Sequence, residues 1–112
     1  MGLIVENEMA AYCLLDVREV IDPAKLQEYR RRVLATVQLY GGRYLVVGGK
    51  CDVVEGTWRP TYPVLIRFPD LDQAYKWYGS EEYKDLKALR LLATRCDVVF
   101  IEAESNEFVS GD

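Results

Sequence analysis

The sequence predicts an α+β domain in which strands and helices follow one another as β-α-β-β-α-β. Three observations support this order: strand-like alternation in residues 12–18, a helix-initiating Asp22-Pro23 pair, and a legible succession of turn, strand and helix over residues 55–83. The order is that of the ferredoxin-like fold, a four-stranded antiparallel sheet with both helices on one face. The other face of the sheet is then uncovered.

The chain has 112 residues, of which half are hydrophobic and 29% are charged. This composition is typical of a folded protein, and the length is that of one domain that buries roughly two thirds of its unfolded surface. We assign the domain to residues 11–103, with an N-terminal extension at residues 1–10 and a polar tail at residues 104–112.

The first half of the domain is predicted to begin with a strand and a long helix. The strand covers residues 12–18, where the alternate residues Cys13, Leu15 and Val17 make one face fully apolar. Asp22 supplies an N-cap oxygen, and Pro23 suits the first helical position. The helix is expected to end at Gly41-Gly42.

A hairpin is predicted next. Its first strand covers residues 43–47 and meets Gly48-Gly49, which suggests a bulge or bend before strand pairing resumes through residues 51–54. Residues 55–60 form the hairpin turn.

The second half continues with a third strand at residues 64–68. Asp70 begins the next helix, which breaks at Gly79, and Ser80 caps its continuation. The last strand is predicted at residues 98–103.

Strand alternation assigns each side chain to one face of the sheet. The apolar set expected under the helices is Cys13, Leu15, Val17, Val64, Ile66, Phe68, Val99, Ile101 and Ala103. The set expected on the open face is Tyr12, Leu14, Leu65, Val98 and Phe100. So much exposed apolar surface is unusual for a monomer, and we predict that the sheet of a second copy covers it.

The charge and the hydropathy of the chain disfavour two classes of partner, nucleic acid and a membrane. A net charge of -4 and a pI near 4.9 disfavour nucleic acid, whose binding depends on Lys and Arg. The basic run Arg30-Arg31-Arg32 is interpreted as a solvated helix face, with a phosphate site as the less favoured alternative. No stretch reaches the ~20 apolar residues that cross a membrane.

Cysteine and histidine usage limits the chemistry. The three cysteines, Cys13, Cys51 and Cys96, show no C-x-x-C spacing, so we expect reduced thiols and a cytoplasmic protein. The chain has no histidine, which removes Ser-His-Asp and Cys-His catalysis, histidine metal clusters and a histidine ligand for haem. Haem bound through Tyr or Cys has no other support, and we expect no metal and no cofactor.

Three charged residues are candidates for a ligand site on the face opposite the helices: Asp16, Arg67 and Glu102. Two carboxylates beside one guanidinium could anchor an anionic ligand, and one acid could transfer a proton. The alternative is an ion-pair network at a dimer interface. We favour the alternative, because buried charges need partners.

Three further candidates are Tyr44, Trp58 and Arg59. Trp58 and Arg59 lie in the predicted turn, where they could cover a pocket mouth, with the indole stacking on a flat ligand. The favoured alternative is packing against the core or a neighbouring subunit. Tyr44 could offer its phenol to a substrate, or it could lie in the core or an interface.

Over residues 9–103 the chain contains a set of residues that together resemble the pattern of one protein family. They are Ala11-Tyr12, Asp22-Pro23, Tyr40-Gly41-Gly42-Arg43-Tyr44-Leu45, Gly48-Gly49, Glu55-Gly56, Trp58-Arg59-Pro60, Phe68-Pro69, Ala74, Trp77-Tyr78, Ser80, Glu82-Tyr83, Lys87-Ala88 and Arg90. On these residues the chain resembles the bacterial family catalogued as domain of unknown function 1330, within the dimeric α+β barrel superfamily. The resemblance implies a homodimer whose two sheets face each other in a barrel, and it brings no agreed activity.

Two residues depart from the family pattern. Val47 stands where relatives often carry Arg, and Pro63 opens a strand where a hydrogen-bonding residue is usual, so a charged pocket wall is expected to be missing. Relatives in the superfamily include haem-degrading and cofactor-free monooxygenases, chlorite dismutases and muconolactone isomerase. The scaffold therefore supports catalysis without dictating a reaction.

The leading functional hypothesis is a cytoplasmic bacterial homodimer that binds a small organic ligand and could act as a cofactor-free isomerase, lyase or monooxygenase. The alternative is a non-catalytic dimerisation or ligand-sensing module. A pocket lined by Asp16, Arg67 or Glu102 would favour the first hypothesis.

Overall fold

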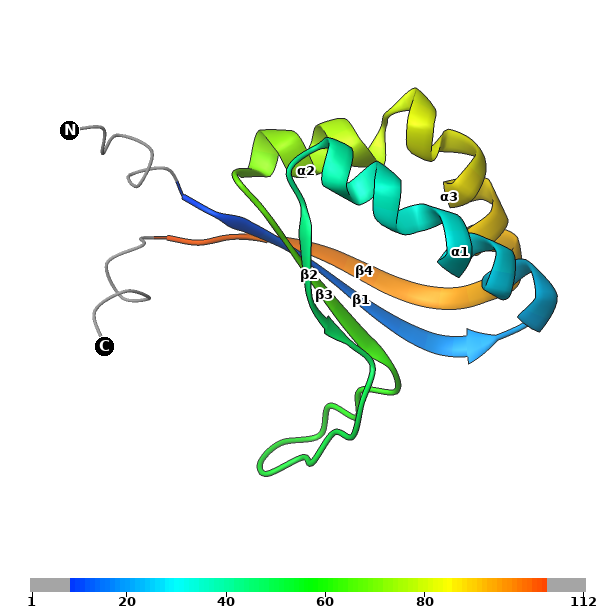
Figure 1. The fold of residues 1–112 in the computed structure, drawn as a ribbon. Helices are drawn as coiled ribbons and strands as arrows, with labels where there is room; N and C mark the ends of the chain where they lie inside the picture. Colours follow the sequence, from blue (N-terminus) through cyan, green and yellow to red (C-terminus); the bar gives the residue numbers. More distant parts are fainter. Residues whose placement is uncertain (1–8, 105–112) are drawn as a thin grey trace.

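Four antiparallel strands form a sheet with helices on one face only (Figure 1). The computed structural model describes residues 9–104, so the predicted extension (1–10) and tail (104–112) lie almost entirely outside the described residues. The elements are β1 (Ala11–Val20), α1 (Pro23–Leu39), β2 (Arg43–Val47), β3 (Pro63–Phe68), α2 (Leu71–Tyr78), α3 (Glu81–Ala93) and β4 (Thr94–Glu102). The strand order β2-β3-β1-β4 confirms the ferredoxin-like α+β fold.

The helices begin where the sequence predicts, because each has a side-chain cap. Asp22, Asp70 and Ser80 each accept a hydrogen bond from the backbone N–H three residues later, at 3.1, 2.8 and 3.1 Å. The predicted break at Gly79 separates α2 from α3. These local signals set the positions from which the helices cover the sheet.

The core lies between the helices and the covered face of the sheet. Its largest fully buried side chains are Trp77, Tyr83, Phe68, Ile66, Val37 and Cys13. The rings of Trp77 and Tyr83 pack with centroids 4.1 Å apart, joining α2 to α3. The inward faces predicted for β1 and β3 are confirmed, since Cys13 and Leu15 lie in this core with Ile66 and Phe68.

The face assignment predicted for β4 is wrong. Phe100 lies under the helices, with its ring centroid 5.0 Å from that of Tyr75 and 5.7 Å from that of Tyr78. Val99 and Ile101 are instead about half exposed, at 51% and 45% of their surface. The open face therefore carries Val99 and Ile101 in place of Val98 and Phe100.

Alternation could not decide the faces of β4, because both of its alternate sets are apolar. Cys96, Val98 and Phe100 form one set, and Val99 and Ile101 form the other. The strand begins at Thr94, immediately after α3, and its antiparallel pairing with β1 decides which set meets the helices. The long-range register thus overrides an uninformative local pattern.

Residues 48–62 form an irregular connection between β2 and β3 that extends away from the helices (Figure 1). The strand pairing predicted at residues 51–54 is absent, and these residues are exposed. Gly48 and Gly49 have positive φ angles of 69° and 117°, which carry the chain out of β2. None of the described helices is long and apolar enough to cross a membrane.

Candidate functional site

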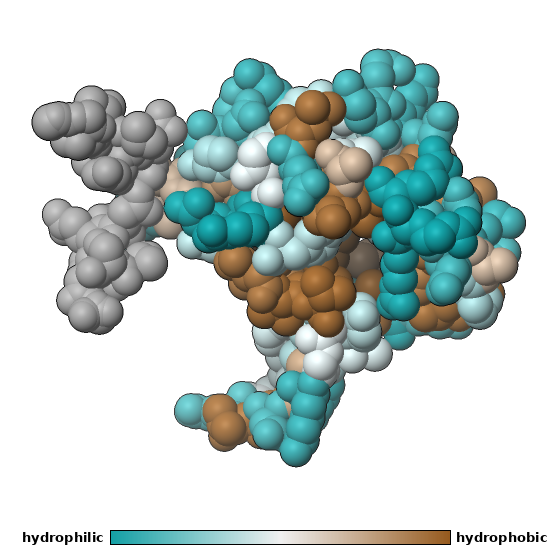
Figure 2. Space-filling view, in the orientation of Figure 1, coloured by the Kyte–Doolittle hydropathy of each residue, from teal (hydrophilic) through white to brown (hydrophobic). Residues whose placement is uncertain are grey.

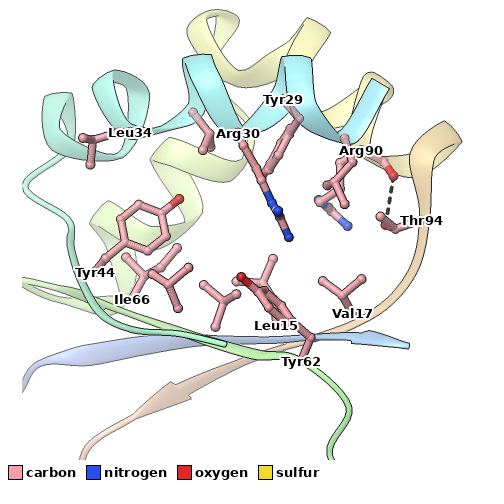
Figure 3. A pocket seen from close by; sticks show the side chains of 14 residues that line it. Leu15, Val17, Tyr29, Arg30, Leu34, Tyr44, Tyr62, Ile66, Arg90 and Thr94 are labelled. Carbon is pink, nitrogen blue, oxygen red and sulfur yellow. Dashed lines mark hydrogen bonds between the residues drawn. The ribbon is translucent and has the colours of Figure 1, made fainter. Parts of the chain in front are cut away.

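A cavity of about 560 Å³ lies between α1 and the covered face of the sheet (Figure 3). Its aliphatic lining consists of Leu15, Val17, Leu26, Val33, Leu34, Val47, Val64 and Ile66. Its polar lining consists of Tyr29, Arg30, Tyr44, Tyr62, Arg90 and Thr94. In Figure 2 the surface is hollowed below the helices, with hydrophobic residues on one side and hydrophilic residues on the other. The cavity is therefore a largely apolar chamber with a few polar groups, as small-molecule sites usually are.

The guanidinium of Arg90 is the principal charged group inside the cavity. Arg90 is only 3% exposed, and its described hydrogen-bond acceptors are neutral: Nε donates to the Tyr83 hydroxyl at 3.3 Å and Nη2 to the Tyr78 hydroxyl at 3.4 Å. Within residues 9–104, no carboxylate lies within 4.0 Å of it. A buried cation normally has an anionic partner, so this position is open to one.

A hydrogen-bonded chain of phenols extends from Arg90 across the top of the cavity. The hydroxyls of Tyr83 and Tyr29 are 2.7 Å apart. Burial raises the pKa of Tyr29, and it raises the pKa of Tyr83 although the Arg90 charge partly opposes this. Burial also raises the pKa of Tyr44, on the opposite side of the cavity. These phenols stay protonated at neutral pH and act as hydrogen-bond donors rather than as bases.

The mouth of the cavity is bounded by Arg30 and Tyr62. The guanidinium carbon of Arg30 lies 5.3 Å from the centroid of the Tyr62 ring. Gly48 permits this ring position, because a Cβ there would lie 2.3 Å from Tyr62 Cε1. Leu34 and Val47, 49% and 60% exposed, provide an apolar edge to the same mouth.

Among the residues predicted to form a site, Tyr44 is the one that lines this cavity. Asp16 is buried on the opposite face of the sheet, where its carboxylate accepts hydrogen bonds from Arg18 Nη1 at 2.6 Å, Thr61 N at 2.9 Å and Tyr62 N at 2.8 Å. Asp16 therefore attaches the end of the 48–62 connection to β1.

The predicted grouping of Asp16, Arg67 and Glu102 is not formed. Arg67 lies opposite Tyr12, four residues along β1 from Asp16. Glu102 lies opposite Ala11, at a position that alternates to the helix-covered face. The expectation depended on the face assigned to β4. Because the two faces of β4 are exchanged relative to the prediction, Glu102 is on the other side of the sheet from Asp16 and Arg67.

The structure does not bring Trp58 and Arg59 to the cavity. Trp58 is 58% exposed in the 48–62 connection and is not part of the lining. The backbone carbonyl of Arg59 accepts a hydrogen bond from Arg18 Nη1 at 2.9 Å, on the side of the molecule where Asp16 lies. Arg30 and Tyr62, rather than Trp58 and Arg59, lie at the mouth of the cavity.

Sequence reasoning missed Arg90 as a site residue. The signal was present, since Arg90 continues the helical stripe of Tyr83, Leu86 and Ala93, all of which are buried. An arginine within an apolar stripe is unusual, because long charged side chains are seldom fully buried without a partner. Arg30, Arg31 and Arg32 are exposed, as predicted for the basic run, and sequence reasoning missed only that Arg30 also lines the cavity.

Comparison with solved structures supports the fold. The RPA0582 protein of unknown function from Rhodopseudomonas palustris is 14% identical and has a TM-score of 0.68, over 86% of this chain and 83% of that chain. SnoaB, a cofactor-independent oxygenase from Streptomyces nogalater, is also 14% identical and has a TM-score of 0.57, over 88% of this chain and 95% of that chain. At these identities the similarity concerns the fold alone.

Comparison of the sequence with family models identifies one family. No curated protein matches the chain. The model of the domain of unknown function DUF1330 matches residues 10–104, which include every described helix and strand. The chain therefore belongs to the DUF1330 family.

Proposed function

We propose that the cavity binds a small organic anion with an apolar body, and that the anionic group contacts Arg90. The observation that carries this proposal is a guanidinium that is 3% exposed, faces a cavity, and has only neutral hydrogen-bond partners among the described residues. A ligand carboxylate or enolate would provide the missing charge and accept hydrogen bonds from the guanidinium. The volume of about 560 Å³ suits a ligand of this class.

The polar groups of the cavity favour stabilising an anion over generating one. Arg90 and the neighbouring phenols can donate hydrogen bonds to a negative oxygen of a bound ligand. The lining residues include no carboxylate, and the tyrosines with raised pKa are poor bases. We therefore favour a ligand that is already ionised at neutral pH. Such a ligand could be bound only, or converted by a cofactor-free reaction of an acidic enol or phenol, and SnoaB shows that the fold accommodates a cofactor-independent oxygenase.

A second copy of the chain is proposed to cover the open face of the sheet, giving a homodimer. Val46, Val99 and Ile101 are 41%, 51% and 45% exposed there, and Leu14 and Leu65 lie between them in the strand register. Apolar residues in such number on a face without helices suit an interface. Light scattering at micromolar concentration should give the mass of a dimer, and a monomer mass would contradict the proposal.

Ligands that differ only in charge test the binding proposal. Calorimetry should show 3-phenylpropanoate binding at least about tenfold more tightly than the neutral 3-phenylpropanamide, as expected for a charge-assisted hydrogen bond. Arg90→Gln should abolish this preference. Arg32→Gln is the matched control, because Arg32 lies on α1 outside the lining and pairs with Glu28. Equal affinity for the acid and the amide in the unaltered protein would contradict the proposal.

A further inference from the structure

A second arginine that lines the cavity, Arg30, is exposed at the mouth and has no anionic partner among residues 9–104. The next two arginines on α1, Arg31 and Arg32, both form ion pairs with Glu28. The Arg30 guanidinium instead lies over the Tyr62 ring, and none of its N–H groups donates a hydrogen bond to a described residue. These donors are therefore available to a ligand at the mouth.

The position of Arg30 is defined by a fixed aromatic partner. The Tyr62 backbone N–H donates to the buried Asp16 carboxylate at 2.8 Å, and its carbonyl accepts from Val17 N at 3.1 Å. The ring also packs directly against Gly48. Tyr62 thus provides a rigid support on which the arginine rests.

Arg30 and Arg90 point into the same cavity from different helices. Figure 3 shows both side chains entering from the helix layer towards the side where Val17 and Tyr62 lie, while Leu34 and Tyr44 lie towards the other side. The lining contributes two positive charges and no carboxylate. Negative charge placed between the buried Arg90 and the exposed Arg30 would be attracted to both guanidinium groups.

We infer that the ligand carries a doubly negative head group, held between Arg90 at the inner wall and Arg30 at the mouth, with an apolar body directed towards Tyr44. This inference rests on the proposed function and adds the charge of the head group to it. The chemical class is a dicarboxylate whose two acidic groups lie at one end of a hydrocarbon or aromatic body. Arg90 binds one carboxylate in the interior, and the N–H groups of Arg30, which rests on the Tyr62 ring, bind the other.

A charge series with one common body tests the inference. Benzylmalonate is 3-phenylpropanoate with a second carboxylate on the carbon that bears the first, and both of its acidic groups are ionised at neutral pH. Calorimetry should show benzylmalonate binding about tenfold or more tightly than 3-phenylpropanoate, the difference expected from one further charge-assisted contact. Arg30→Gln should bring the two affinities together, because it removes only the outer charge.

Matched variants separate the two proposals. Arg32→Gln should leave the preference for benzylmalonate unchanged, and circular dichroism of each variant would show that it is folded. Arg90→Gln should weaken binding of both acids. Equal affinities for the two acids in the unaltered protein would overturn the inference while leaving the proposed function intact. Failure of both acids to bind would overturn both proposals, and an undiminished preference in Arg30→Gln would overturn the role of Arg30.

Discussion

Two charged side chains are almost fully buried in the described part of the chain, and they lie on opposite faces of the sheet. Asp16, 4% exposed, accepts hydrogen bonds from one guanidinium and two backbone amides. Arg90, 3% exposed, has only neutral described partners and faces a cavity. The two side chains are therefore about equally buried. They differ in that Asp16 has a partner of opposite charge, whereas the described partners of Arg90 are neutral.

The comparison shows how a structural charge differs from one available to a ligand. Burial tends to raise the pKa of Asp16, but the hydrogen bonds from Tyr62, Arg18 and Thr61 outweigh it, so the net effect is a lowered pKa. This carboxylate is satisfied by the folded chain itself. Among the described residues Arg90 has only neutral hydrogen-bond partners, and a bound anion would supply the opposite charge. A buried charge without an oppositely charged partner is thus a better indicator of a ligand site than burial alone.

The largest expected effect comes from placing a new charge on each face. Phe100→Asp puts an unpaired carboxylate beneath the helices and should unfold the domain, since such a charge costs several kcal/mol. Ile101→Asp places it on the open face, where the fold should persist and dimerisation should fail. Circular dichroism and light scattering would measure both effects. A folded Phe100→Asp together with an unfolded Ile101→Asp would contradict the assignment of the β4 faces.

Removal of the Asp16 carboxylate should have the next largest effect. Asp16→Ala leaves the amides of Thr61 and Tyr62 without their acceptor, and we expect a loss of about 3 kcal/mol in the free energy of unfolding. Asp97→Ala is the matched control, because Asp97 pairs with Asp16 in the strand register and is exposed. Denaturant unfolding should show a change below about 0.5 kcal/mol for the control. Similar losses of stability in Asp16→Ala and Asp97→Ala would contradict the structural role assigned to the Asp16 carboxylate.

Acidification should have a smaller effect on stability than removal of the Asp16 side chain. The pKa of Asp16 lies below its ordinary value of 3.8, so its contribution to stability is complete above that value and is lost as pH falls through the lowered pKa. The stability difference between the unaltered protein and Asp16→Ala should therefore narrow in strong acid. Unfolding curves over a pH series would measure it. A difference that widened on acidification would contradict the sign of the pKa shift.

The smallest expected stability effect is that of Arg90→Met, a substitution of similar length. Since no carboxylate of residues 9–104 lies within 4.0 Å of Arg90, replacing Arg90 with an apolar side chain should lower the free energy of unfolding by no more than about 1 kcal/mol, and it could raise it. The same variant should lose the binding of 3-phenylpropanoate. Denaturant unfolding would measure the stability of the variant, and calorimetry would measure its binding of 3-phenylpropanoate. A stability loss as large as that of Asp16→Ala would assign Arg90 a structural role.

The sequence by itself determined the features that depend on neighbouring residues. The caps at Asp22, Asp70 and Ser80 and the break at Gly79 follow from backbone groups a few residues away, and all four are found where predicted. The alternation in β1 and β3 determined their faces, because only one set in each strand suits a core. From these elements the ferredoxin-like order followed.

Only the tertiary structure decided the faces of β4 and the composition of the cavity. Phe100 and Ile101 are equally apolar in sequence, and pairing with β1 chose between them. Tyr44, a candidate ligand-binding residue from the sequence, lines the cavity, but Arg30 and Arg90 are separated by sixty positions in the chain. Nothing local indicates that they line one cavity or that, within residues 9–104, neither forms an ion pair with a carboxylate. Partners of a buried charge come from distant segments, and folding alone brings them within the few ångströms over which they act.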